Sequence, residues 1–104
     1  MARHLALTRE DAAGLLRAHA REIRERGVTR MALFGSLARG DTQAASDVDV
    51  VVDVDPAYRF SLLDQAGLRL FLCDLFGCET DVVIREDLSP DFKARIAAEQ
   101  VVVI

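Results

Sequence analysis

Two aspartates in the middle of the chain could bind a metal ion. Asp47 and Asp49 are separated by a single valine at the start of the alternating run DVDVVVDVD. Alternate side chains of a strand share one face, so these carboxylates would stand side by side, about 7 Å apart along the strand. Two negative charges at about 4 Å repel by about 4 kcal/mol at an effective dielectric of about 20. A divalent cation offsets that repulsion, and carboxylate oxygens suit magnesium or manganese.

A glycine–serine pair upstream could bind an anion. Gly35 and Ser36 lie where an apolar strand gives way to a short helical turn that Gly40 can end. Gly35 permits a positive φ or a close backbone approach. The first amides of the turn and the Ser36 hydroxyl can then donate to phosphate. A phosphate site here, combined with a cation at Asp47 and Asp49, describes a nucleoside triphosphate chelated to magnesium.

Other sites fit these residues less well. A Walker A loop needs a Gly-Lys-Ser/Thr ending, which GSLARGD lacks. An EF-hand needs a ligand where Val51 stands and a glycine at its sixth position. An exposed acidic strand face is the simplest alternative, but Ser36 lies eleven residues before Asp47 and both segments are typical of strands, which favours a site. We expect Asp53 and Asp55, nearer the end of the strand, to be solvated carboxylates.

Helix and strand signals alternate along the chain, which is typical of an α/β domain. We expect a first helix after a capping-box-like start at Thr8, with an apolar stripe through His19 to Ile23 and a stop at Gly27. His19 is expected to be a partly buried helix residue. The other expected elements are strands over 28–34, 48–54, 80–84 and 101–104, and helices over 61–76 and 90–99, the latter capped by Ser89.

Composition restricts the class of protein further. The length of 104 residues suits one domain, and 51% hydrophobic with 29% charged residues is typical of a globular chain. A net charge of −4 argues against direct nucleic-acid binding. No apolar segment reaches the length of a signal peptide core or a membrane span, so we expect a cytoplasmic protein without membrane contact. Cys73 and Cys78 are expected to pack in the core.

The stretch GSLARGDTQAASDVDVVV resembles the signature of the minimal nucleotidyltransferases, which are small relatives of the DNA polymerase beta superfamily. The resemblance covers essentially the whole chain. It implies one nucleotidyltransferase-fold domain over residues 1–104, with a small mixed β-sheet flanked by helices. It also implies a third carboxylate on a later strand, which Asp81 in TDVVI matches. Arg39 matches the family's arginine and would neutralise phosphate charge, while Ser46 matches a serine that we expect to be a loop hydrogen-bonder.

The resemblance further implies the reaction, which is in-line attack of a hydroxyl on the α-phosphorus of ATP with release of pyrophosphate. Two Mg²⁺ ions, or Mn²⁺ in their place, would stabilise the attacking and leaving oxygens. Asp81 would help hold the second ion and act on the acceptor hydroxyl. The implied catalytic and metal-binding residues are Asp47, Asp49 and Asp81, and the implied nucleotide-binding residues are Gly35, Ser36 and Arg39.

Members of this family are typically antitoxins paired with a HEPN-domain ribonuclease toxin. The resemblance therefore implies transfer of AMP to a tyrosine of such a toxin, in a homo- or hetero-oligomer. No second domain follows the last expected strand, so we expect the acceptor to bring its own recognition surface. The helix over 61–76 has two apolar stripes, of which one could cover the sheet and leave the other for a partner, unless the helix is buried on a wide arc. One stripe comprises Leu63, Ala66, Leu70 and Cys73, and the other comprises Leu68, Phe71, Leu72, Leu75 and Phe76.

Two other functions stay open. A catalytically idle nucleotide-binding module could neutralise the toxin by direct contact alone. Adenylation of an antibiotic would need an acceptor pocket that so short a chain hardly offers.

Overall fold

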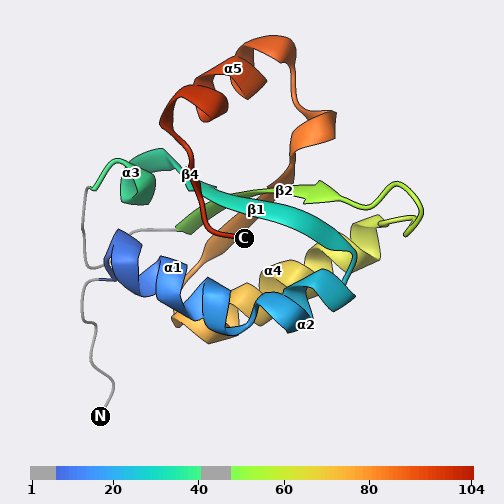
Figure 1. The fold of residues 1–104 in the computed structure, drawn as a ribbon, viewed down its shortest axis with the longest axis horizontal. Coiled ribbons are helices and arrows are strands. Elements are labelled where there is room, and N and C mark those ends of the chain that lie inside the picture. Colours follow the sequence, from blue (N-terminus) through green and yellow to red (C-terminus); the bar gives the residue numbers. More distant parts are fainter. Residues whose placement is uncertain (1–6, 41–47) are drawn as a thin grey trace.

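The computed structural model describes residues 7–40 and 48–104, which form a four-stranded sheet with helices on both faces (Figure 1). The expected α/β class with a small mixed sheet is confirmed. The elements in chain order are α1 (Arg9–Ala18), α2 (Ala20–Glu25), β1 (Val28–Phe34), α3 (Gly35–Ala38), β2 (Val48–Val54), α4 (Leu62–Phe76), β3 (Thr80–Ile84), the 3₁₀ helix η1 (Arg85–Asp87), α5 (Pro90–Glu99) and β4 (Val101–Val102).

The strand order, β3-β2-β1-β4, mixes two kinds of pairing. β1 is antiparallel to both β2 and β4, whereas β2 and β3 are parallel. A parallel pair needs a crossover connection, and α4 provides it between β2 and β3. This topology brings the starts of β2 and β3 to the same edge of the sheet as the end of β1.

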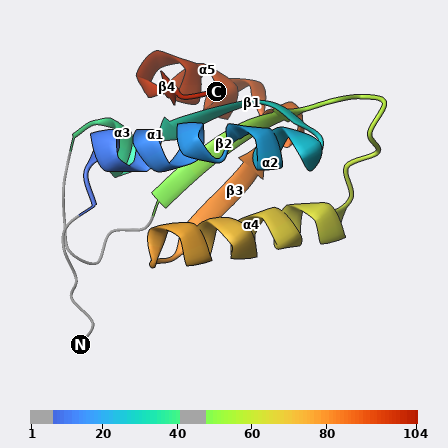
Figure 2. The ribbon, with the colours of Figure 1, turned by 60° about the horizontal axis from the view of Figure 1, so that its bottom comes forward.

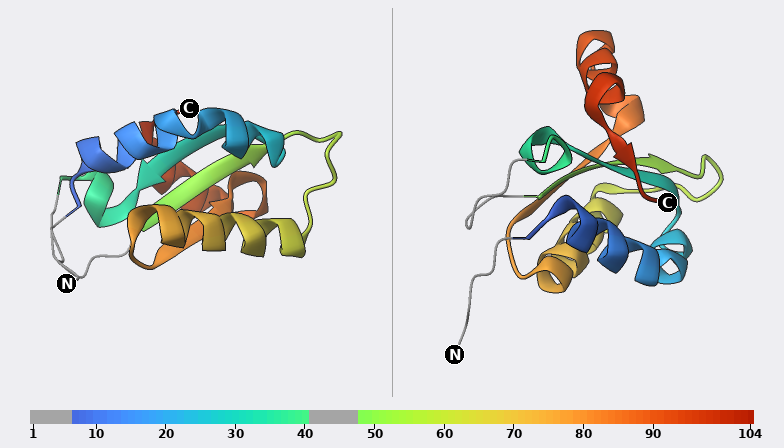
Figure 3. Two further views of the ribbon diagram at one scale, coloured as in Figure 1. Left: turned by 90° about the horizontal axis from the view of Figure 1, so that it is seen from below. Right: turned by 60° about the vertical axis from the view of Figure 1, so that its left-hand side comes forward.

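Both faces of the sheet are covered. On one face, α1, α2 and α4 pack over the sheet (Figure 2). Val48, Val50 and Val52 of β2 are buried in the core on this face, and Val54 is partly buried there. On the other face lies α5, as the right-hand view of Figure 3 shows. The residues buried there are Ala32, Phe34, Val51 and Ile96. Because Val51 is fully buried beside Val50 and Val52, β2 is apolar on both faces at its centre.

The first helix differs from its prediction as one continuous element. The structure divides it into α1 and α2 at His19, although the apolar periodicity continues through this residue. The backbone N–H of His19 donates to the carbonyls of Leu15 and Leu16, and its ring Nδ1 lies 2.9 Å from the Leu15 carbonyl oxygen. These contacts tighten the last turn of α1 and end it. His19 is half-buried, as expected, with its ring edge-on to Phe71.

The ends of the remaining helices largely follow their caps. Thr8 and Asp11 form the predicted capping box of α1, and Ser61 and Asp64 form a second one at the start of α4. Gly77, at φ 71°, ends α4 in the left-handed conformation. The final strand is shorter than predicted and ends at Val102. None of the helices in residues 7–40 and 48–104 is long and apolar enough to cross a bilayer.

Candidate functional site

Two of the three predicted carboxylates lie side by side on neighbouring strands. Asp49 of β2 is in register with Phe34 of β1 and with Asp81 of β3, so the three form one row across the sheet. Adjacent strands are about 4.8 Å apart, and residues in register on a parallel pair share a face. Asp49 is half-buried and Asp81 is exposed. Asp47 lies outside the described residues, as do Ser46 and the predicted loop over 42–46.

The carboxylate of Asp49 points at Gly35, the residue that follows this row on β1. Gly35 has φ +78°, a conformation that side chains with a Cβ rarely adopt. A Cβ at this position would lie only 2.4 Å from Oδ2 of Asp49. Two independent constraints, one on φ and one on space, therefore require glycine here. Gly35 and Ser36, the glycine–serine pair predicted from the sequence, form a corner between β1 and α3, and the Asp49 carboxylate reaches this corner directly.

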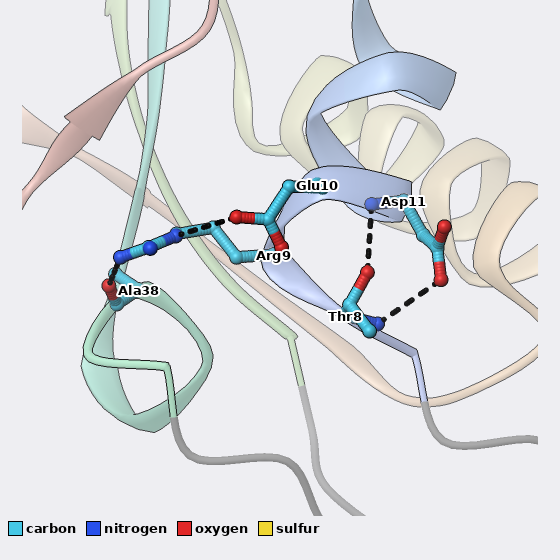
Figure 4. Close-up of polar contacts among 5 residues, drawn as sticks. All are labelled: Thr8, Arg9, Glu10, Asp11 and Ala38. Atoms are coloured by element: carbon cyan, nitrogen blue, oxygen red, sulfur yellow. Dashed lines mark hydrogen bonds and ion pairs between the residues drawn. The ribbon is translucent and has the colours of Figure 1, made fainter.

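α3 carries this corner as a single helical turn. Leu37 and Ala38 anchor it, because only 2% and 3% of their surfaces are exposed. Arg9 ties the end of α3 to α1 by donating from Nη1 to the Ala38 carbonyl at 2.8 Å (Figure 4). The first amides of a helical turn have no partner within the helix, so those at Ser36 and Leu37 are donors of the kind that bind phosphate.

Arg39 directly follows α3 and stands beside the corner. Its backbone N–H donates to the Gly35 carbonyl at 3.2 Å. Its Nη1 lies 3.4 Å from Oε1 of Glu99, the last residue of α5, and the arginine side chain is half-exposed. The same Glu99 oxygen accepts the Gly35 N–H at 3.2 Å. Glu99 was not among the residues predicted from the sequence. An acidic residue in the last turn of a helix is unfavourable, so its position could have marked it as a candidate.

The prediction that Asp53 and Asp55 are solvated carboxylates is wrong for Asp53 of β2 and is confirmed for Asp55, which is exposed just after the strand. Oδ1 of Asp53 accepts a hydrogen bond from Nε of Arg85 at 2.9 Å, and both side chains are partly buried. Oδ1 of Asp55 accepts the backbone N–H of Ala57 at 2.9 Å and so stabilises the turn after β2. Both carboxylates therefore have structural roles, at the end of β2 away from Asp49.

The donor set at the corner is suited to a hard divalent cation. Asp49 and Asp81 offer carboxylate oxygens, the ligands that magnesium and manganese prefer. Within the described ranges no group of three metal-ligating side chains is found, and the third carboxylate of the prediction, Asp47, is outside them. The described pair is thus compatible with part of a metal site, and the amides of α3 with a phosphate beside it.

Comparison with known proteins gives the family. The model of the nucleotidyltransferase domain family matches residues 16–104. The protein adenylyltransferase MntA of Thermococcus cleftensis is 37% identical over 98 residues, which is 93% of this chain and 97% of that protein. A solved structure assigned to the minimal nucleotidyltransferases aligns with a TM-score of 0.69 and 32% identity, covering 89% of each chain.

A more distant likeness concerns the fold alone. The crystal structure of a toxin–antitoxin complex with AMP-PNP contains a chain that aligns with a TM-score of 0.71 at 18% identity. The alignment covers 94% of this chain and 73% of that one. The family match, the relative of 37% identity and the solved structure of 32% identity show that the chain belongs to the nucleotidyltransferase domain family, among the minimal nucleotidyltransferases.

Proposed function

We propose that this chain is a magnesium-dependent protein adenylyltransferase that transfers AMP from ATP to a tyrosine hydroxyl of a HEPN-type toxin, and so acts as its antitoxin in the cytoplasm. The observation that carries the proposal is the meeting of Asp49, Asp81 and Gly35 at one edge of the sheet. The relative named protein adenylyltransferase MntA supports a protein acceptor, since it matches over nearly its whole length.

Each residue at this edge has a role in the proposal. Gly35, Ser36 and Arg39 bind the nucleotide's phosphate oxygens, through backbone amides, a hydroxyl and a guanidinium. Asp49 and Asp47 would hold one Mg²⁺, and Asp81 would help hold a second. When bound, the two ions would stabilise the charge on the attacking and leaving oxygens.

The proposed reaction is a direct displacement at the α-phosphorus. Asp81, the more exposed of the two described carboxylates, orients the acceptor hydroxyl or accepts its proton. The hydroxyl oxygen forms a bond to the α-phosphorus, the bond from that phosphorus to the bridging oxygen breaks, and pyrophosphate leaves. The exposure of Asp81 is consistent with an acceptor that arrives on another molecule.

A second candidate function, neutralisation by binding alone, is favoured by an apolar stripe on α4. Leu62, Leu63 and Leu70 are 82%, 85% and 61% exposed, while Leu68 and Leu72 on the inner side are fully buried. This agrees with the sequence prediction of one stripe on the sheet and another available to a partner. α4 covers the face opposite to α5 (Figure 1), so a toxin seated on the stripe would have to reach around the sheet to present its tyrosine.

Labelled ATP separates the two functions. The chain is incubated with Mg²⁺, a candidate HEPN-type partner and ATP labelled at either the α- or the γ-phosphate. If the chain is a transferase, the α-label should appear on the partner and the γ-label in released pyrophosphate. The variant Asp49→Asn should label neither the partner nor pyrophosphate. A tight complex that stays unlabelled, for the wild type and Asp49→Asn alike, would instead establish the binding module.

A further inference from the structure

The C-terminal end of α5 lies against the corner that the proposed function assigns to the nucleotide's phosphates. Oε1 of Glu99 accepts a hydrogen bond from the Gly35 amide at 3.2 Å and lies 3.4 Å from Nη1 of Arg39. The glutamate is partly buried, with 34% of its side chain exposed. One carboxylate oxygen thus has two contacts with the groups expected to bind phosphate.

Glu99 is poorly placed for the stability of its own helix. The C-terminus of a helix carries a partial negative charge, which a carboxylate in the last turn opposes. α5, which is described over its whole length, has no basic residue in that turn to compensate. The Gly35 amide and the Arg39 guanidinium provide the compensation instead. The Glu99 carboxylate is thus unfavourable for its own helix, and its favourable contacts are with the candidate site. This arrangement indicates a role for Glu99 in that site.

A carboxylate oxygen and a phosphate oxygen are alternative acceptors for the same donors. A triphosphate at the corner would bring several negative charges next to Glu99, beside the carboxylate of Asp49 that already abuts Gly35. In a partly buried site such like charges repel strongly. Glu99 and the nucleotide therefore compete for the Gly35 amide and for Arg39.

We propose, on the basis of the proposed function, that Glu99 is a competitor built into the chain that sets its affinity for nucleotide. Without nucleotide, Glu99 holds the Gly35 amide and Arg39 in place. When Mg·ATP binds, both donors pass from the carboxylate to phosphate oxygens, and Glu99 turns away from the corner. The negative charge of Glu99 weakens binding, so removing that charge strengthens it.

Calorimetric titration with Mg·AMP-PNP tests this inference on the wild type, Glu99→Gln and Glu22→Gln. Gln at position 99 keeps an oxygen for the Gly35 amide but loses the charge. Glu22, exposed on α2, gives the same change of net charge away from the corner. We expect Kd to fall about tenfold for Glu99→Gln, with a smaller gain at high salt, and to stay unchanged for Glu22→Gln.

Two results of the titration have different meanings. Equal or weaker nucleotide binding by Glu99→Gln than by the wild type overturns the inference and leaves the proposed function standing. A failure of both proteins to bind nucleotide overturns the proposed function, and the inference with it.

A second measurement needs no substitution and so does not depend on how a variant folds. In the wild type, saturating Mg·AMP-PNP should shift the carboxylate ¹³C signal of Glu99 and the amide signal of Gly35, while the carboxylate signal of Glu22 stays in place. A Glu99 signal that does not move at saturation contradicts the exchange of donors.

Discussion

At the scale of single residues, the contact between Gly35 and Asp49 decides the shape of the site. The glycine has a positive φ, and the space where its Cβ would stand is taken by the carboxylate. Any larger residue must either change the backbone of α3 or push Asp49 away from the edge. The position of Asp49 relative to Asp81 therefore depends on the absence of a Cβ at residue 35.

The substitution Gly35→Ala tests this dependence, with Gly77→Ala as its matched control. Both glycines have a similar φ, 78° and 71°, but a Cβ at Gly77 would meet nothing within 4 Å. Left-handed backbone costs an alanine about 1–2 kcal/mol, so Gly77→Ala should lose that much unfolding free energy in urea and Gly35→Ala should lose more, because its Cβ must also displace Asp49. Only Gly35→Ala should also lose AMP transfer, on the order of 100-fold, because a shift of about 1 Å in a reacting group has that effect.

The difference in transfer rate between the two variants shows whether AMP transfer depends on the position of Asp49. Equal transfer rates for Gly35→Ala and Gly77→Ala, measured under conditions where both are folded, would show that the position of Asp49 is not critical.

Residue types and spacing could single out Gly35, Ser36 and Asp49 as candidates because each stands at a recognisable point of a strand or turn, whereas Asp81 came from the family resemblance. Contacts between distant parts of the chain could not be predicted in this way. Arg85 and Asp53 are 32 residues apart, and Gly35 and Glu99 are 64 apart. Nothing local marks these pairs, since only the packing of α5 and η1 against the sheet brings them together.

At the scale of elements, α3 is a turn of four residues held at both ends by other helices. Arg9 of α1 binds its last carbonyl, and Glu99 of α5 binds its first amide. A helix this short has little stability of its own. The geometry of the corner is therefore set by α1 and α5 together with the buried Leu37 and Ala38.

The substitution Arg9→Ala should loosen α3. It removes a partly buried hydrogen bond to the Ala38 carbonyl, which contributes about 1 kcal/mol to the unfolding free energy. It also removes the ion pair with Glu10 seen in Figure 4, so Glu10→Gln is the control that removes the ion pair alone. That pair is mostly exposed, and its loss should cost less than about 0.5 kcal/mol.

The activity of these two variants gives a second readout. Arg9→Ala should raise the KM for ATP several-fold by disturbing the phosphate-binding amides, and Glu10→Gln should not. If both variants leave KM at the wild-type value, α1 has no part in positioning the corner.

Most strands and helices could be predicted because their signals are local. β1, β2 and β3 match their expected bounds, as does α5 after its Ser89 cap. The break at His19 could not be predicted, because the apolar stripe continues across it. The sheet order and the mixture of parallel and antiparallel pairs also follow from long-range contacts rather than from any single segment.

At the scale of the whole molecule, the sheet separates two surfaces. Asp49 and Asp81 are in register on the face of the sheet where Val51 packs with Ile96 of α5. α4, which carries the exposed leucines, covers the opposite face (Figures 1 and 3). Val51 could have indicated that both faces are covered, since it interrupts the alternation of aspartate and valine in β2. Nucleotide chemistry and partner binding can therefore be changed separately.

The variants Leu63→Glu and Leu70→Glu use this separation. With the toxin docked on the α4 stripe, as the second candidate function requires, each should weaken the complex at least tenfold, about 1.4 kcal/mol, by placing a charge in an apolar interface. A glutamate introduced at an exposed site outside the stripe, Ala18→Glu on α1, should leave the affinity for the partner unchanged. All three should unfold within about 0.5 kcal/mol of the wild type, since these positions are exposed.

Two readouts check this prediction. Binding is measured by titration against the partner, and nucleotide affinity, measured alone, should be unchanged in all three variants. Wild-type affinity of Leu63→Glu and Leu70→Glu for the partner would exclude the α4 stripe as the docking surface.

The central claim is that the carboxylates at one edge of the sheet act together in AMP transfer. The most direct test is the rate of transfer to the partner toxin by Asp49→Asn, Asp81→Asn and Asp53→Asn. Asp53 lies on the same strand and face as Asp49 but is paired with Arg85, so it is a matched control. The account predicts losses of about 100-fold or more for Asp49→Asn and Asp81→Asn and near-wild-type transfer by folded Asp53→Asn. Wild-type transfer by Asp81→Asn, or equal losses in all three variants, would contradict it.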